Sequence, residues 1–113
     1  MTHDISAERQ EELRARVVKG IAFLDTKRPS WALDIPAPDE LDIQDTTRCV
    51  TAQLSGSFWW RTGMEQLGLT LGEYTALGFR LGDQEYDEDQ YDFLTDAWKT
   101  EVFDRRTKAE ATA

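Results

Sequence analysis

Three consecutive aromatic residues, Phe58, Trp59 and Trp60, constrain the fold of this 113-residue chain more than any other feature. Successive side chains on a helix point about 100° apart, so these three rings cannot all face one core. We therefore expect at least one of them, Trp59, to be partly exposed or to pack beneath a neighbouring loop. The run lies in the segment 48–69, which also contains the only cysteine and three of the seven glycines. This segment is predicted to be the centre of a small helical core.

Apolar residues recur at helical spacing towards both ends of the chain. The first predicted helix covers residues 7–28, and its apolar stripe consists of Leu13, Val17, Ile21 and Leu24. The last predicted helix covers residues 87–106, and its stripe consists of Tyr91, Leu94, Trp98 and Val102. We expect these two helices to pack near each other, with the region 49–67 between them.

Shorter helices are predicted in the middle of the chain. Asp45 or Thr46 is a good N-cap for a helix that ends near residue 54. This helix either continues through residues 55–57, or it ends at Gly56 and Ser57 caps a second helix. Another helix is predicted over residues 70–77, because the segment that begins at Thr70 has the sequence of a capping box.

The fold class that follows is all-α, a compact single domain of four to five helices. Residues 7–106 form this domain, and residues 1–6 and 107–113 are expected to be flexible. Pro36 and Pro38 exclude a regular helix in the segment 30–45, so we expect an ordered loop there with extended segments or short helical turns. Its apolar residues should fix the loop to the domain.

The charge of the chain limits its partners. The net charge of −9 disfavours direct binding to nucleic acid or to an anionic membrane, because both require a cationic surface. A single cysteine cannot form an intrachain disulfide, and no apolar segment resembles a signal peptide or a membrane span. We expect a cytoplasmic protein that binds another protein; its oligomeric state stays open.

The sequence offers little for catalysis or for metal binding. Cys49 lacks a base, since the only histidine is His3, and it is predicted to be a small buried core residue. Acids alternate from Asp83 to Asp87 as at the start of a calcium loop, but Glu88 occupies the position that requires glycine. We therefore expect a protein that is not an enzyme and that has no catalytic residues, metal or cofactor.

Two surfaces are candidates for binding a partner. Trp31, Trp59 and Arg61 could form a protein-binding site, since tryptophan and arginine are frequent in interface hot spots. The alternative is that the loop 30–45 covers Trp59 through Trp31, which would make these rings part of a core.

The second candidate is an acidic face in the segment 83–96, which contains seven acids and no basic residue. Its candidate members are Asp83, Glu85, Asp87, Glu88, Asp89 and Asp92. Such a row could imitate the phosphates of a nucleic acid and inhibit a host defence or transcription enzyme. The alternative is a solvated helix surface without a specific role.

A series of short motifs in fixed order resembles a family of small, uncharacterised proteins of actinobacteria and their bacteriophages. The motifs are RVVKGIAFLD at residues 16–25, Pro29 with Trp31, Leu41-Asp42, Cys49-Val50 with Gln53-Leu54 and Gly56, LGL at 67–69, LGF at 77–79, Tyr91, Leu94-Thr95, Ala97-Trp98 and Arg105-Arg106. The resemblance implies a phage or prophage gene product and brings no catalytic residues. We therefore expect a non-catalytic accessory protein that binds a host or phage protein in the host cytoplasm.

Overall fold

Six α-helices and two 3₁₀ turns occur within residues 5–112, the part of the chain that the computed structural model describes. In chain order they are α1 (Ala7–Lys27), α2 (Trp31–Asp34), η1 (Pro38–Glu40), α3 (Val50–Ser55), α4 (Trp60–Gln66), α5 (Leu71–Ala76), η2 (Asp83–Glu85) and α6 (Glu88–Thr112). These residues contain no strand, which confirms the all-α class. The predicted number of four to five helices is too low, because the loop before residue 45 contains a short helix of its own.

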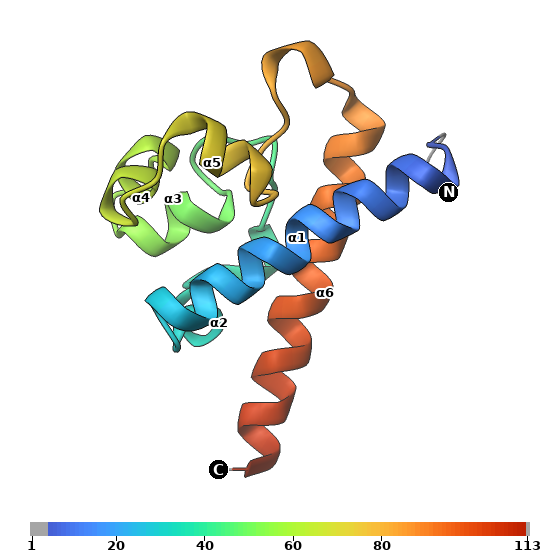
Figure 1. Cartoon of the computed structure of the whole chain (residues 1–113). Coiled ribbons are helices and arrows are strands. Elements are labelled where there is room, and N and C mark those ends of the chain that lie inside the picture. Colours follow the sequence, from blue (N-terminus) through green and yellow to red (C-terminus); the bar gives the residue numbers. More distant parts are fainter. Residues whose placement is uncertain (1–4, 113) are drawn as a thin grey trace.

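The two long helices, α1 and α6, cross and contact each other directly (Figure 1). Helices α3, α4 and α5 lie together on one side of this crossing. The prediction that the region 49–67 lies between α1 and α6 is therefore wrong. The Cα radius of gyration is 13.4 Å, close to the value of about 13 Å expected for one compact domain of this length.

The crossing depends on two glycines. A Cβ atom on Gly20 would lie 2.1 Å from the carbonyl oxygen of Leu77 and 3.0 Å from the ring of Trp98. Gly78 has a φ of +79°, and a Cβ there would lie 2.9 Å from the backbone nitrogen of Val17. Trp98 is fully buried and donates its indole N–H to the carbonyl of Gly78 at 2.8 Å. The chain after α5 can therefore approach α1 only because both residues lack a side chain.

The segment 30–45 is an ordered connection that packs on the domain. Gln53, a buried polar side chain, bonds both backbone groups of Ala37, and Thr95 of α6 accepts the backbone N–H of Ile43. The apolar residues Trp31, Ile35, Leu41 and Ile43 are buried, as expected, whereas Leu33 is exposed. Hydrogen bonds to the backbone therefore fix the loop together with its apolar side chains.

Several helix ends differ from the predicted ones. Ser6 caps α1 by accepting the N–H of Arg9. α3 begins only at Val50, because residues 45–48 form turns in which the Asp45 side chain accepts the N–H of Thr47. α6 gives residues 107–112 a helical backbone; their flexibility stays a prediction, as does that of the N-terminal segment.

The packing at Gly20 leads to the first testable prediction. Gly20→Ala should lower the free energy of unfolding by about 2 kcal/mol or more, because the new methyl group would overlap the Leu77 carbonyl and the Trp98 ring. Urea unfolding followed by Trp fluorescence measures this change. Gly72→Ala is the matched control: it lies in α5 with open space around it, so this change should be neutral or stabilise the protein by up to about 1 kcal/mol. Equal effects of the two substitutions would contradict the proposed close packing.

Candidate functional site

The chain changes direction between α3 and α4 at a corner formed by residues 56–59. Gly56 adopts the left-handed conformation and ends α3, so the predicted alternative of a helix break at this glycine is correct. Ser57 does not cap the next helix; Trp59 occupies the N-cap position of α4. Phe58 has a φ of +56° and is the one non-glycine residue with positive φ in the described part of the chain. This conformation costs an aromatic residue about 1 kcal/mol.

Close packing of α3 against α4 holds this corner in place. A Cβ atom on Gly63 would lie 2.1 Å from the carbonyl oxygen of Thr51, so the two helices approach to a distance that only glycine permits. The Thr51 hydroxyl donates to the carbonyl of Trp60, and the N–H of Trp60 donates to the carbonyl of Thr46 at 2.9 Å. Both backbone groups of Trp60, the residue after the corner, are therefore hydrogen-bonded. These bonds restrict the conformation of the corner before any partner binds.

Two of the three consecutive aromatic rings point towards solvent. Phe58 is 47% exposed and Trp59 is 44% exposed, and Arg61 is also exposed. Trp60 points inward, and its ring centroid lies 5.6 Å from that of Tyr74. We call Phe58, Trp59 and Arg61 the aromatic corner. The exposure of Trp59 agrees with the sequence analysis, and that of Phe58 extends the same surface.

The third predicted anchor, Trp31, is not part of this surface, and that prediction is wrong. Trp31 has no exposed surface, and its ring lies edge-on to Trp98 in the core. Its indole N–H donates to Asp25, whose carboxylate also accepts two hydrogen bonds from Arg105. Because Trp31 joins α2 to α1 and α6, it neither binds a partner nor covers Trp59.

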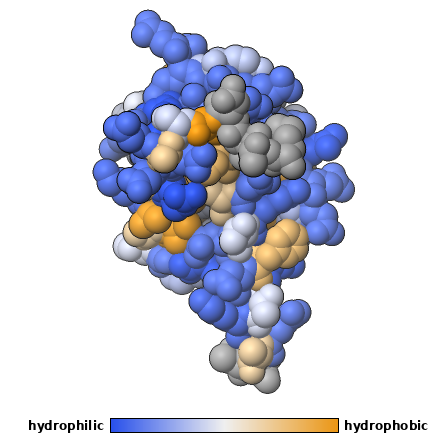
Figure 2. Space-filling view, turned by 90° about the vertical axis from the view of Figure 1, so that its right-hand side faces the viewer, coloured by the Kyte–Doolittle hydropathy of each residue, from blue (hydrophilic) through white to orange (hydrophobic). Residues whose placement is uncertain are grey.

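The charge around the aromatic corner differs from that of the chain as a whole. Residues 46–64 contain Arg48 and Arg61 but no acidic residue, whereas the net charge of the chain is −9. Both arginine side chains are exposed. Another face of the molecule is largely hydrophilic, with only small apolar patches between polar side chains (Figure 2). Arg48, however, pairs with Asp45 at 3.4 Å, so the corner is an apolar site at which Arg61 supplies the basic group.

Two members of the predicted acidic face form ion pairs within the fold. Glu85 forms ion pairs with Arg9 and Arg16 of α1 and accepts the N–H of Gly82, which joins η2 to α1. Hydrogen bonding from Arg16 outweighs partial burial and lowers the pKa of Glu85 to about 2. Asp83 pairs with Arg80 at 2.7 Å. Glu85 is thus held within the fold, whereas Asp83 is 90% exposed and its ion pair contributes little.

The remaining acids lie at the start of α6. Asp87 precedes the helix and accepts the N–H of Gln90, as an N-cap residue does. Glu88 and Asp92 are exposed, and Asp89 is half-buried. Acidic side chains in the first turn of a helix interact favourably with the positive end of the helix dipole. This interaction explains the position of these acids without a binding role. The structure brings the six acids of the predicted face together, but they are not six equivalent exposed charges.

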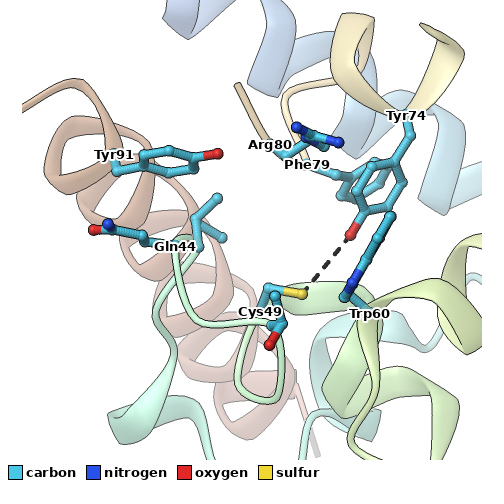
Figure 3. A pocket seen from close by; sticks show the side chains of 9 residues that line it. Gln44, Cys49, Trp60, Tyr74, Phe79, Arg80 and Tyr91 are labelled. Carbon is cyan, nitrogen blue, oxygen red and sulfur yellow. Dashed lines mark hydrogen bonds between the residues drawn. The ribbon is translucent and has the colours of Figure 1, made fainter. Parts of the chain in front are cut away.

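A half-enclosed pocket of about 190 Å³ lies beside the aromatic corner, on the inner side of Trp60 (Figure 3). Its main lining groups are the rings of Trp60, Tyr74, Phe79 and Tyr91, the thiol of Cys49 and the side chain of Arg80. Ile43, Gln44 and Thr46 complete the lining, and the last two are exposed, so the pocket reaches the surface. Sequence reasoning missed this site, because its residues come from four separate segments of the chain.

A chain of polar groups runs along one wall of the pocket. Thr51 donates its single hydroxyl proton to the carbonyl of Trp60, so the Tyr74 hydroxyl must be the donor in its bond with Thr51. The oxygen of Tyr74 can then accept the thiol proton of Cys49, with a sulfur–oxygen distance of 3.7 Å. Burial raises the pKa of Tyr74 well above its usual range. These groups therefore form a neutral hydrogen-bond chain.

The pocket lacks a recognisable catalytic arrangement. Cys49 is buried, as the sequence predicts, and its neighbours are hydroxyl groups that do not act as bases when neutral. Within residues 5–112, no three potential ligands from His, Cys, Asp and Glu gather around a common point. The pocket is chemically suited to bind a small molecule through rings and hydrogen-bond donors.

Comparison of the chain with protein-family models, curated proteins and solved structures finds no match. Across the described helices, none combines the length and the apolar character that crossing a bilayer requires. The aromatic corner and the pocket are the two features of the described residues that bear on function.

The ion pairs of Glu85 predict a specific loss of stability in acid. Because the pKa of Glu85 is lowered from 4.5 to about 2 on folding, its carboxylate stabilises the fold above pH 4.5. This contribution, about 1–2 kcal/mol after allowance for solvent screening, is lost as the pH falls from 4.5 to 2. Glu85→Gln should therefore lower the free energy of unfolding at pH 7 and have little effect at pH 2, as measured by urea unfolding.

Glu88→Gln is the matched control for this measurement, since Glu88 is an exposed acid on the neighbouring turn. It should change the free energy of unfolding by less than about 0.5 kcal/mol at either pH. An equal effect of Glu85→Gln at pH 7 and pH 2 would contradict the assigned role of the carboxylate.

Proposed function

We propose that this protein is a non-catalytic binding protein whose contact site is the aromatic corner of Phe58, Trp59 and Arg61. In line with the resemblance to actinobacterial and phage proteins, its partner would be a host or phage protein. The observation that carries this proposal is the backbone of Phe58, which adopts an unfavourable conformation and leaves the ring 47% exposed. A strained residue that gains so little burial is better explained by a role in binding than by packing.

The surroundings of the corner support a role in recognition. Tryptophan and arginine supply most of the energy at many interfaces, and Trp59 and Arg61 flank the inward-facing Trp60. Hydrogen bonds on either side of the corner and the tight contact at Gly63 reduce the entropy that binding would remove. The site is thus pre-organised for contact with a second surface.

The local charge indicates the chemistry of the partner surface. Arg61 is exposed beside the two apolar rings, whereas Arg48 is already paired with Asp45 at 3.4 Å. An apolar pocket bordered by carboxylates would complement both features, since opposite charges around an interface favour the correct partner. The rest of the chain carries an excess of acidic residues, which an acidic partner surface would repel. This repulsion would orient the corner, rather than another face, towards the partner.

Imitation of a nucleic acid is the weaker alternative. A mimic requires a row of free carboxylates, but Glu85, in the middle of the row, is bound by two arginines. Asp87 serves as a helix cap. The acids left for such a role are the exposed Asp83 and the three acids in the first turns of α6, Glu88, Asp89 and Asp92. The three on α6 are explained by the helix dipole without any partner.

The two functions can be distinguished by affinity capture from an actinobacterial lysate followed by measurement of the affinity for the captured protein. Trp59→Ala should weaken binding about 30-fold or more, because a hot-spot truncation costs about 2 kcal/mol. Leu33→Ala is the matched control, since Leu33 is an exposed apolar residue on α2, and it should leave binding unchanged. The triple neutralisation Glu88→Gln, Asp89→Asn and Asp92→Asn should also have little effect. Loss of binding in that variant, with retention in Trp59→Ala, would instead support the mimic.

The strain at Phe58 provides an independent test of the same proposal. Asparagine tolerates the left-handed conformation better than phenylalanine does. Phe58→Asn should therefore leave the free energy of unfolding unchanged or raise it by up to about 1 kcal/mol, while binding is lost. If Phe58 had only a structural role, this substitution would instead destabilise the protein by about 2 kcal/mol or more, as truncation of a core aromatic residue does. Urea unfolding of the purified variant decides between these outcomes.

A further inference from the structure

The pocket behind Trp60 contains a buried hydroxyl group with an unused proton. Tyr91 is only 8% exposed, and its oxygen accepts the N–H of Leu81 at 3.3 Å. No acceptor for the Tyr91 hydroxyl proton occurs among the described residues. This hydroxyl points into the space between Tyr91 and the rings on the opposite wall (Figure 3). A buried donor without a partner is unfavourable unless water or a ligand supplies an acceptor.

Arg80 supplies a second donor near the same place. Its Nε donates to the carbonyl of Leu81, the residue whose N–H binds Tyr91, so both side chains are anchored to one residue. One Nη atom donates to Asp83, and the other has no acceptor among residues 5–112. The partner Asp83 is itself largely exposed, so its ion pair contributes little and leaves Arg80 available to a ligand. The pocket therefore offers a ligand two hydrogen-bond donors, the hydroxyl of Tyr91 and the guanidinium of Arg80.

The rest of the wall is suited to a flat apolar molecule. The rings of Trp60, Tyr74 and Phe79 lie in sequence, with centroid separations of 5.6 Å and 5.2 Å, and Tyr91 faces them across the gap. The volume of about 190 Å³ exceeds the roughly 150 Å³ of an apolar cavity that accepts benzene. A single six-membered ring with a small substituent therefore matches the size of the pocket.

We propose that this pocket binds a small planar aromatic molecule that carries a carbonyl or carboxylate oxygen. The ring would lie between Tyr91 and the wall of Trp60 and Tyr74. The oxygen would accept hydrogen bonds from the hydroxyl of Tyr91 and from Arg80. Binding here does not depend on the aromatic corner, because Phe58 and Trp59 do not line the pocket.

Nuclear magnetic resonance titration tests this site with three probes: benzamide, benzoate and toluene. Benzamide and benzoate have the same shape, but only benzoate is charged, and toluene lacks an acceptor. We expect benzamide, benzoate or both to bind with dissociation constants near the millimolar range, as small ligands of this size do. The signals of the Trp60 indole and of the amides of Ile43 and Cys49 should shift. Tighter binding of benzamide would indicate that the natural ligand carries a neutral carbonyl oxygen. Tighter binding of benzoate would indicate an anionic carboxylate.

Tyr91→Phe removes the proposed donor and keeps the ring. It should weaken the binding of the acceptor probes about fivefold, the effect of one hydrogen bond, and leave toluene binding unchanged. Thr26→Val is the control, since it removes a hydroxyl that is bonded within α1 and does not line the pocket.

Several results would overturn the proposal. These are no saturable shift with either acceptor probe, tighter binding of toluene than of both, or unchanged affinity in Tyr91→Phe. Shifts confined to the open groove between α1 and α6, near Val18 and Thr100, would also do so. If Tyr91→Phe does not fold, the shift map and the ranking of the three probes on the native protein still decide the question.

Discussion

The packing of Trp98 at the crossing of α1 and α6 is the constraint on which the rest of the structure depends. The ring is fully buried and stacks on Phe79 at a centroid separation of 5.1 Å, while its N–H binds the carbonyl of Gly78. Gly20 leaves space on α1 for both the ring and the Leu77 carbonyl. A side chain larger than hydrogen at that position would separate α1 from the chain after α5. The position of the small helices, and with it the pocket, follows from this contact.

Aromatic rings continue from this crossing to the surface. Consecutive centroids from Trp31 through Trp98, Phe79, Tyr74 and Trp60 to Trp59 are separated by 5.1 to 6.2 Å. Such pairs add stability beyond the area they bury, so the series joins α2, α6, α5 and α4 into one core. The last ring of the series is exposed, and the pocket opens beside the ring before it. Both proposed binding sites therefore rest on a rigid aromatic support.

Acidic residues stabilise the fold, whereas the net charge alone suggests an acidic surface for binding. Two carboxylates connect segments that are distant in sequence: Glu85 of η2 binds α1, and Asp25 of α1 binds Arg105 of α6 as well as the nearby Trp31. The excess acid is spread over the fold, whereas the segment 46–64 has none. A local stretch of sequence shows these acidic residues, but it does not show the arginines on other helices that pair with them.

The sequence by itself determined the all-α class, the two long helices, the capping box at Thr70 and the burial of Cys49. The exposure of Trp59 agrees with the sequence analysis, but the helix assumed there does not exist. Phe58 has a positive φ and Trp59 is extended, so the corner between α3 and α4 turns these rings outward. Only the tertiary structure decided that Trp31 is buried and that Phe58 is exposed. The same is true of the meeting of Cys49, Tyr74, Arg80 and Tyr91 around one pocket. Those outcomes depend on contacts between residues far apart in the chain, which no periodic pattern records.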